Sequence, residues 1–150
     1  MRSPAKLVNI LLIQLKRIGD LVLTTPAIAA LRHRFPEAKL TLVVSGECAP
    51  LLPAVAGIDR TLIMHRSLAD AAAFLTVARS RFESCIDFTR NDRSAFLTFL
   101  SRAQKRIVSY RVKRRSRFRR EAYNEFVQHR ISFKYEPLRR SLWRPSTWFA

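Results

Sequence analysis

Short runs of apolar residues alternate along this chain with segments in which apolar residues recur every three or four positions. The first run, residues 7–14, is almost entirely apolar and partly β-branched, which is typical of a strand covered on both faces of a parallel sheet. Similar runs predict four more strands, at residues 39–44, 60–65, 84–88 and 106–110. Strands alternating with helices predict an α/β fold, a Rossmann-like doubly wound parallel sheet with right-handed crossovers.

Helical spacing between these runs predicts four helices. The first begins at Thr25–Pro26, an N-cap followed by proline, and a short second helix covers 49–55. The third covers 68–81 with Ser67 as its N-cap, and the fourth covers 93–103. For the first, third and fourth helices the spacing places these residues toward the core: Ile28, Leu31 and Phe35; Leu68, Ala72, Leu75 and Ala78; Phe96, Leu97 and Leu100.

The loop after the first strand is the candidate site. In open α/β sheets, ligands bind at the carboxyl ends of the strands, where loops and helix N-termini converge. Asp20 follows the first strand and therefore lies at the mouth of such a site, with two cations, Lys16 and Arg17, close to it in sequence. Gly19 fits a turn that needs a positive φ or a close approach by a ligand. The loop thus offers one candidate base and two candidate anion binders.

The segment 10–32, with its Gly19–Asp20 and Thr25–Pro26–Ala27 elements, resembles the opening of the family 9 glycosyltransferases, the lipopolysaccharide heptosyltransferases. Residues 86–95 resemble a later strand end of that family and the helix that follows it. The resemblance covers about residues 7 to 127 and implies the N-terminal domain of a GT-B glycosyltransferase. Such an enzyme transfers a heptose from a nucleotide sugar, ADP-heptose, to the lipopolysaccharide inner core, and it needs no resident cofactor.

The resemblance places the catalytic base at Asp20. Sugar transfer with inversion needs one carboxylate to take the proton of the acceptor hydroxyl as the donor bond breaks. The alternative is a helix N-cap, a role that aspartate performs equally well, and the two roles are compatible. Lys16 and Arg17 are expected to hold carboxylate or phosphate groups of the acidic acceptor, with Gly19 between them and the base. Exposed loop cations without a ligand are the alternative for both.

Arg93 follows the fourth predicted strand and would also lie at the carboxyl edge of the sheet. It is expected to meet the same acceptor. The alternative is a structural residue in the first turn of its helix, paired with Arg90 and Asp92 in an exposed charge cluster that would contribute under about 1 kcal/mol.

Charge is the unusual property of the composition. The chain carries a net charge of +17, of which residues 102–150 contribute +12. The densest run predicts a surface that binds polyanions, with a phosphorylated lipid A acceptor or the anionic surface of the inner membrane as the favoured partner. It consists of Lys113, Arg114, Arg115, Arg117, Arg119 and Arg120. Nucleic acid is the less favoured partner, because no nucleic-acid module surrounds the run. A basic polyanion-binding module without catalysis is the alternative function.

Several other sites and classes are excluded or disfavoured. Three isolated histidines and two cysteines without metal spacing predict no metal site, and the two thiols indicate a reducing, cytoplasmic compartment. No G-x-G-x-x-G or P-loop motif is present. Asn9 and Gln14 interrupt the first apolar run, which disfavours a signal peptide. The chain is thus expected in the cytoplasm, peripherally on the inner membrane.

Members of this family are about twice as long as this chain and hold the donor mostly in a second domain. Residues 1–128 are therefore expected to form a Rossmann-like acceptor-side domain that is inactive alone, because it does not position the donor. Residues 129–150 are an unassigned basic tail, and we hypothesise a truncated or frame-shifted product. A partner chain that supplies the donor-binding domain is the other explanation.

Overall fold

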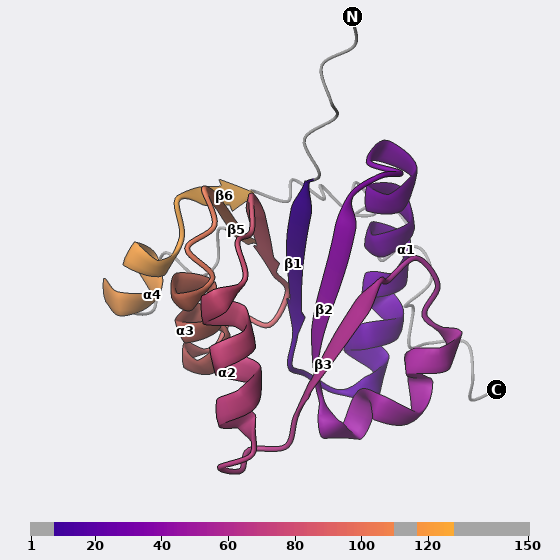
Figure 1. Cartoon of the computed structure of the whole chain (residues 1–150), viewed down its shortest axis with the longest axis horizontal. Coiled ribbons are helices and arrows are strands. Elements are labelled where there is room, and N and C mark those ends of the chain that lie inside the picture. Colours follow the sequence, from indigo (N-terminus) through magenta and orange to yellow (C-terminus); the bar gives the residue numbers. More distant parts are fainter. Residues whose placement is uncertain (1–7, 110–116, 128–150) are drawn as a thin grey trace, which may run out of the picture.

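The computed structural model describes residues 8–109 and 117–127, which form one parallel sheet with helices on both faces (Figure 1). The strand order is β3-β2-β1-β4-β5-β6, and every neighbouring pair is parallel. The strands are β1 (Asn9–Gln14), β2 (Lys39–Ser45), β3 (Arg60–Met64), β4 (Ser84–Asp87), β5 (Lys105–Ser109) and β6 (Glu125–Val127). The helices are α1 (Ile18–Arg34), the 3₁₀ helix η1 (Gly46–Ala54), α2 (Asp70–Arg79), α3 (Asp92–Leu100) and α4 (Arg117–Ala122). The predicted doubly wound α/β fold is confirmed.

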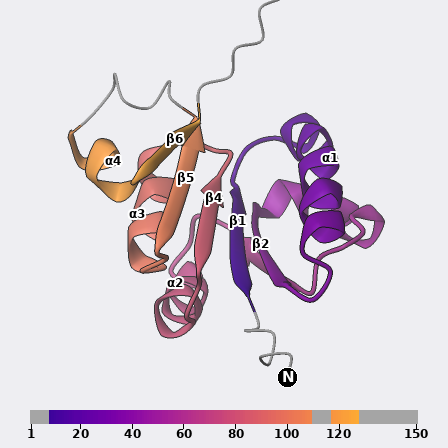
Figure 2. The ribbon, with the colours of Figure 1, turned by 90° about the horizontal axis from the view of Figure 1, so that it is seen from above.

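The helices divide between the two faces of the sheet. Seen from above, α1 lies on one side of β1 and β2, whereas α2, α3 and α4 cover the opposite face (Figure 2). Successive residues of β1 point to opposite faces, so Leu11 and Ile13 join the core under α2 and α3, and Ile10 and Leu12 join the core under α1 and η1. Each of these side chains is at most 3% exposed, and such burial stabilises the fold by about 1.5–3 kcal/mol per residue. The sheet is therefore a rigid base for the loops at its edges.

Helix α1 begins eight residues earlier than the sequence predicted. Its first residue is Ile18, so Thr25 is no N-cap and Pro26 lies inside the helix. Proline has no N–H to donate to the carbonyl one turn before it. The Thr25 hydroxyl donates to the Val22 oxygen at 2.8 Å instead, which satisfies that carbonyl. The Thr–Pro pair therefore marks a tolerated proline in a helix, and the signal for a helix start was wrong.

The buried face of α2 also differs from the prediction. Ala73 and Val77 are buried, whereas Leu68 is 97% exposed and precedes the helix, and Leu75 is 50% exposed. Ser67 is not the N-cap, because the cap residue is Ala69. The predicted stripe is wrong because alanines fill both sides of this helix, and spacing then does not identify the inner one.

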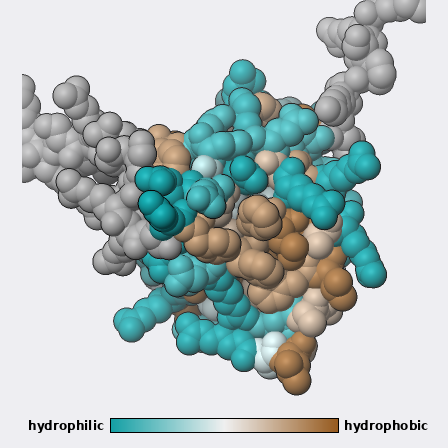
Figure 3. Space-filling view, turned by 90° about the vertical axis from the view of Figure 1, so that its left-hand side faces the viewer, coloured by the Kyte–Doolittle hydropathy of each residue, from teal (hydrophilic) through white to brown (hydrophobic). Residues whose placement is uncertain are grey.

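Helix α3 buries Leu97 as predicted but turns Phe96 outward, where its ring packs edge-on against that of Phe74 at 5.5 Å. Together with Leu75 and Phe99, Phe96 belongs to the large apolar side chains left exposed on these two helices. The face that α2, α3 and α4 present to solvent carries a central apolar patch with hydrophilic side chains around it (Figure 3).

Strand β6, which follows helix α4, adds a sixth strand to the five that the sequence predicted. Tyr123, between α4 and β6, is 4% exposed and packs with Ala95, Val108 and Ala122. The Asn124 side chain accepts a hydrogen bond from the Arg106 N–H at 2.6 Å, which aligns the start of β6 with β5. Residues 129–150 and Lys113, Arg114 and Arg115 of the predicted polyanion surface lie outside the described residues.

Two further sequence expectations concern cysteines and membrane segments. Cys48 and Cys85 are both free and buried, as expected of reduced thiols. Burial raises the pKa of the Cys85 thiol to about 12, so it stays protonated at neutral pH. Within residues 8–109 and 117–127, no helix combines the length and the apolar character needed to cross a bilayer.

Candidate active site at the switch point of the sheet

The strand order reverses between β1 and β4, and the loops that leave these two strands diverge to opposite faces at this point. In open α/β sheets such a switch point forms a crevice in which ligands bind. The two loops are tied together, because the Leu15 N–H donates to the Thr89 hydroxyl at 2.6 Å and the Phe88 N–H donates to the Ile13 oxygen at 3.0 Å. The two loops are therefore held at a fixed separation, and they form the two walls of the candidate site.

Asp20 lies on the first wall, as the third residue of α1. It is partly exposed, and its carboxylate has no hydrogen-bond or ion-pair partner among the residues that the structure describes. The residue before the helix is Arg17, which makes no side-chain cap. Asp20 is therefore not the N-cap that the alternative interpretation required. Its carboxylate is accessible at the edge where the sequence placed it.

The expectation of a turn at Gly19 is corrected by the structure. This residue lies in the first turn of α1 and not in a turn with positive φ, which among the described glycines is found only at Gly57. A Cβ at Gly19 would meet nothing within 4 Å, so the protein itself does not require glycine there. The space in front of it is open, and its assignment to acceptor binding stays a prediction.

Lys16 and Arg17 form the short loop between β1 and α1. Arg17 is exposed and Lys16 is half-buried. The Lys16 carbonyl is fixed by the Ser45 hydroxyl at 2.9 Å and by the Cys48 thiol at 3.4 Å, so the loop is anchored to β2 and η1. Both cations therefore remain beside the first turn of α1, and their role in acceptor binding is untested.

Gln14 is a residue that the sequence interpretation treated only as an interruption of the apolar run. It is 2% exposed at the end of β1. Its Nε2 donates to the backbone carbonyl oxygen of Asp20 at 3.1 Å and to the Thr24 hydroxyl at 2.8 Å. The Thr24 hydroxyl in turn donates to the same backbone carbonyl oxygen of Asp20 at 2.8 Å. Gln14 and Thr24 therefore hold the first turn of α1, and with it the backbone of Asp20. A polar residue at the last position of a buried strand was the available signal.

We expect Gln14→Leu to lower the free energy of unfolding by about 1 kcal/mol, because the Asp20 carbonyl and Thr24 each lose a buried hydrogen bond. The larger effect should be local, with faster amide exchange in the first turn of α1, measured by hydrogen–deuterium exchange. Thr25→Val removes a different hydrogen bond of the same helix and is the control. Unchanged exchange in the first turn of Gln14→Leu would contradict the assigned role.

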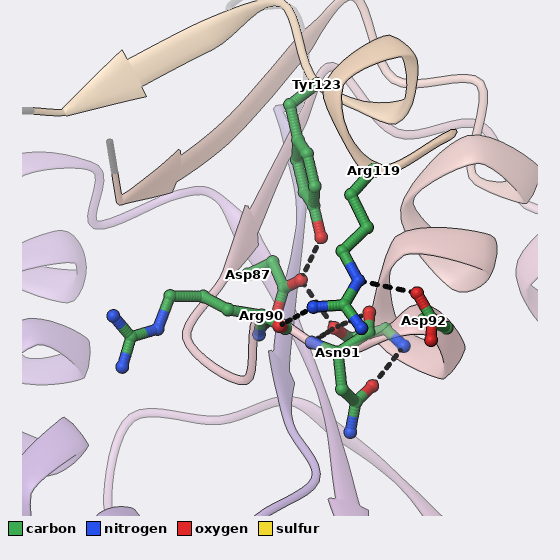
Figure 4. Close-up of polar contacts among 7 residues, drawn as sticks. Asp87, Arg90, Asn91, Asp92, Arg119 and Tyr123 are labelled. Atoms are coloured by element: carbon green, nitrogen blue, oxygen red, sulfur yellow. Dashed lines mark hydrogen bonds and ion pairs between the residues drawn. The ribbon is translucent and has the colours of Figure 1, made fainter. Parts of the chain in front are cut away.

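The second wall of the crevice is the loop from β4 to α3, which is organised by the buried carboxylate of Asp87 (Figure 4). This group is 3% exposed and accepts hydrogen bonds from the N–H groups of Thr89 at 2.7 Å and Arg90 at 3.1 Å. It also accepts from the Ser94 hydroxyl at 2.6 Å and from the Tyr123 hydroxyl. One carboxylate thus joins the loop to α3 and to the segment before β6.

The environment of Asp87 raises two pKa values. Burial raises the pKa of its carboxyl group, although the hydrogen bonds from Ser94 and Tyr123 oppose that shift. The pKa of the Tyr123 hydroxyl is raised as well, first by burial and then by the neighbouring Asp87 charge. Tyr123 is thus a permanent hydrogen-bond donor at neutral pH. Because Asp87 is 3% exposed and its carboxylate already accepts four hydrogen bonds, we assign it a structural role.

The same loop presents Arg90, Asn91 and Arg93. Arg90 has a φ of 64°, a left-handed conformation that residues other than glycine seldom adopt, and the Asp87 carboxylate holds the Arg90 N–H. Asn91 caps α3 through reciprocal hydrogen bonds with Ser94 at 2.8 and 3.0 Å. Arg90 is partly exposed, and no described residue forms an ion pair with it.

One interpretation of the sequence expected Arg93 to pair with Arg90 and Asp92. The structure shows neither pairing. Arg93 forms an ion pair with Asp70, a 3% exposed carboxylate at the start of α2 that also accepts from the His65 and Arg66 N–H groups. Burial lowers the pKa of Arg93, and the nearby Arg66 charge lowers it further. Arg93 is thus at the expected edge, in the first turn of its helix, with one partner already bound.

The described residues include three members of the predicted polyanion surface, and two of them are exposed: Arg117 and Arg120. Arg119 is different, because its guanidinium forms an ion pair with Asp92 at 2.5 Å and approaches the Arg90 oxygen at 3.4 Å (Figure 4). The hydrogen bond to Asp92 raises the pKa of Arg119. Its expected place on a free polyanion surface is therefore corrected: Arg119 fastens α4 to α3.

The described groups at this edge suit one kind of chemistry. An accessible carboxylate without a partner can accept a proton, and the exposed cations next to it can hold an anionic substrate. Within residues 8–109 and 117–127 there is no group of three histidine, cysteine or acidic side chains that could hold a metal ion. The groups at this edge therefore suit the roles of a base and of anion binders.

Comparison with known proteins gives the fold a precedent. No family model matches the chain, and no curated protein matches it. Among solved structures, the E. coli heptosyltransferase WaaC with ADP is 20% identical with a TM-score of 0.68, covering 81% of this chain and 41% of its own. The E. coli ADP-heptose lps heptosyltransferase II is 18% identical with a TM-score of 0.65, covering 80% and 35%.

The glycosyl transferase family 9 protein from Veillonella parvula DSM 2008 is 18% identical with a TM-score of 0.64, again covering 80% of this chain and 35% of its own. The chain thus spans about two-fifths of the length of these structures or less. At these identities the likeness shows the fold alone. The chain has the Rossmann-like fold of the family 9 heptosyltransferases over its N-terminal portion, as the resemblance in sequence implied.

Proposed function

We propose that this chain is the acceptor-side part of a glycosyltransferase that moves a heptose from ADP-heptose to the lipopolysaccharide inner core. The observation that carries the proposal is the Asp20 carboxylate, accessible and unpaired among the described residues, at the switch point of a heptosyltransferase-like fold. In this role Asp20 takes the proton of the acceptor hydroxyl. The acceptor oxygen bonds to the anomeric carbon with inversion, and ADP leaves with the electrons of the broken bond.

The acceptor would be oriented by the cations of the two walls. Arg17 and Lys16 flank the base, and Arg93, although paired with Asp70, keeps 27% of its side chain exposed at the same edge. Guanidinium groups bind carboxylate and phosphate in a fixed fork, which suits an acidic inner-core sugar. Gly19 leaves room for that acceptor beside the helix end.

The donor needs a second set of contacts. Since the chain covers only about two-fifths of the solved heptosyltransferases, we place the donor site in residues beyond this fold, either in a longer product or in a partner chain. Without them the reacting groups are not held together, and the chain alone should transfer little or no sugar. Its place of action would be the cytoplasm, at the anionic surface of the inner membrane.

A basic module that binds polyanions without catalysis is the second candidate, and the net charge of +17 favours it. Titration with inner-core oligosaccharide and with duplex DNA over a salt series separates the two. Affinity that depends on counterion release falls steeply with salt, so DNA binding should disappear first. Binding of DNA that exceeds oligosaccharide binding at physiological salt would favour the module.

We expect the double variant K16Q/R17Q to weaken oligosaccharide binding about tenfold or more, because each charge-assisted hydrogen bond to the acceptor contributes about 1.5–3 kcal/mol. The matched control R34Q/R60Q removes the same charge from exposed residues of α1 and β3 and should change binding less than about twofold. Calorimetric titration measures both. Equal losses in the two variants would contradict a specific role of the loop.

A further inference from the structure

We propose that a hollow at the opposite, amino edge of the sheet is a binding site for a phosphate-bearing anion. The hollow has a volume of about 620 Å³ and lies where α2 and α3 end and their chains return into β4 and β5. Its lining includes three arginines, Arg79, Arg81 and Arg102. This hollow is called the arginine hollow below. This site is separate from the crevice at the carboxyl edge and goes beyond the proposed transfer reaction.

The arginine hollow has an excess of positive charge that nothing in the described structure neutralises. The only carboxylate in its lining belongs to Glu83, and this group accepts the Asn9 N–H at 2.6 Å. Arg79, Arg81 and Arg102 are exposed, and none of the three guanidinium groups has an ion pair or hydrogen bond among the described residues. Three unpaired cations around one concave space are thus available to one anion.

Other described arginines, such as Arg34 and Arg60, also lack an ion pair, but the hollow gathers three of them in one lining. Arg32, Arg93 and Arg119 each form an ion pair with an aspartate. Arg79 has a partial structural explanation, because a cation in the last turn of a helix complements the helix dipole. Arg102 has less of one, since it occupies a left-handed position after α3, φ 50°, where glycine or asparagine is usual.

The geometry of the lining indicates the class of ligand. Each guanidinium presents a planar fork of donors that matches phosphate oxygens, and three of them suit a diphosphate or a phosphomonoester better than a single carboxylate. A volume of about 620 Å³ lies within the range of small-molecule sites. The exposed amide of Gln104 adds neutral donors to the lining. The ligand is therefore a phosphate-bearing anion, either free in solution or carried by a lipid headgroup.

The apolar patch of α2 and α3 reaches this site. Leu75 lies one turn before Arg79, and the Phe99 oxygen accepts the Arg102 N–H at 3.2 Å. The exposed side chains of Leu75 and Phe99 thus lie within about one helical turn of two arginines of the hollow. A lipid headgroup in the hollow would bring the bilayer interface against this patch, whereas a soluble phosphate would leave it uncovered.

The test is titration of the whole chain with inorganic pyrophosphate, and separately with vesicles of phosphatidylglycerol or of phosphatidylcholine. The triple variant R79Q/R81Q/R102Q should weaken pyrophosphate binding, phosphatidylglycerol-vesicle binding, or both, by about tenfold or more. Loss of pyrophosphate binding supports a soluble ligand. Loss of vesicle binding alone, with phosphatidylcholine unbound throughout, supports the lipid headgroup. A wild-type chain that binds neither probe overturns the proposal.

The control removes the same charge from the same edge. The triple variant R34Q/K39Q/R60Q changes exposed cations at the end of α1 and the starts of β2 and β3, away from the hollow. It should weaken binding less than about twofold, because none of these three side chains lines the hollow. Equal losses in both triple variants would mean general attraction to a basic protein and overturn the site. Circular dichroism establishes folding of each variant, and the single variant R102Q replaces R79Q/R81Q/R102Q if that triple variant unfolds.

Discussion

Replacing Asp87 by alanine should lower the free energy of unfolding by about 3 kcal/mol or more. The carboxylate accepts four hydrogen bonds in a site that is 3% exposed, from two backbone N–H groups of the loop and from the hydroxyls of Ser94 and Tyr123. Alanine accepts none of them. The N–H groups of Thr89 and Arg90 and the Tyr123 hydroxyl then lose this acceptor, whereas the Ser94 hydroxyl keeps the Asn91 oxygen at 3.0 Å. Each unsatisfied group costs about 1–3 kcal/mol before relaxation or water entry. Urea unfolding followed by circular dichroism measures the loss.

Asp87→Asn is the matched control, because its amide keeps the shape and one oxygen. That oxygen can still accept from Thr89 and Arg90, while the two hydroxyls can rotate to accept from the amide nitrogen. We therefore expect a loss of about 1 kcal/mol or less, and no melting of the loop. A loss as large as that of Asp87→Ala would mean that the negative charge itself, and not the set of hydrogen bonds, holds the loop.

The same pair of proteins tests the pKa shift. Burial raises the pKa of Asp87 in the folded chain above the ordinary value of 3.8. A raised carboxyl pKa means that the folded state favours the protonated form, so this contribution to stability is full below about pH 4 and is lost as the pH rises through the folded-state pKa. The wild type should therefore lose stability relative to Asp87→Asn as the pH rises. A difference that is constant with pH would contradict the shift.

The sequence predicted β1 and β2 well because these two strands are buried on both faces. A parallel strand such as β1 is almost continuously apolar, and no other element of this length has that pattern. The helices were harder. Thr25–Pro26 has the chemistry of a helix start, yet the Thr25 hydroxyl satisfies the carbonyl that proline leaves free, so the helix continues through it. Local chemistry allowed both outcomes, and the packing of α1 on the sheet decided between them.

The place of Asp20 in the fold could be predicted from the sequence, but the contacts that support it could not. Asp20 follows the first strand in sequence, and strand ends meet at one edge of a parallel sheet, so its place could be inferred. The pairing of Arg93 with Asp70 could not be inferred, because Asp70 precedes Arg93 by 23 residues and reaches it only through the contact of α2 with α3. Gln14 likewise acts through a contact that forms only when α1 folds back on β1.

Asp20→Asn should reduce sugar transfer by about 10²–10⁴-fold, because an amide cannot take the proton of the acceptor hydroxyl. Asn keeps the size of Asp and its place on α1, so acceptor affinity should change less than about twofold. The measurement needs a preparation in which the unmodified chain supports transfer from ADP-heptose, together with the donor-binding part it requires. Release of ADP gives the rate, and calorimetry with the acceptor gives the affinity.

The control for Asp20 is Asp92→Asn, an exposed carboxylate in the first turn of α3 that is paired with Arg119. Both variants remove one negative charge from the first turn of a helix that begins at the carboxyl edge, so general effects of charge on an anionic acceptor act on both alike. Asp92→Asn should keep transfer within a few-fold of the unmodified rate. If Asp20→Asn kept it too, Asp20 would be a surface residue of α1, and the proton would have to leave to another group. Arg17 and Lys16 would then remain as anion binders, and the basic module would be the better account of this edge.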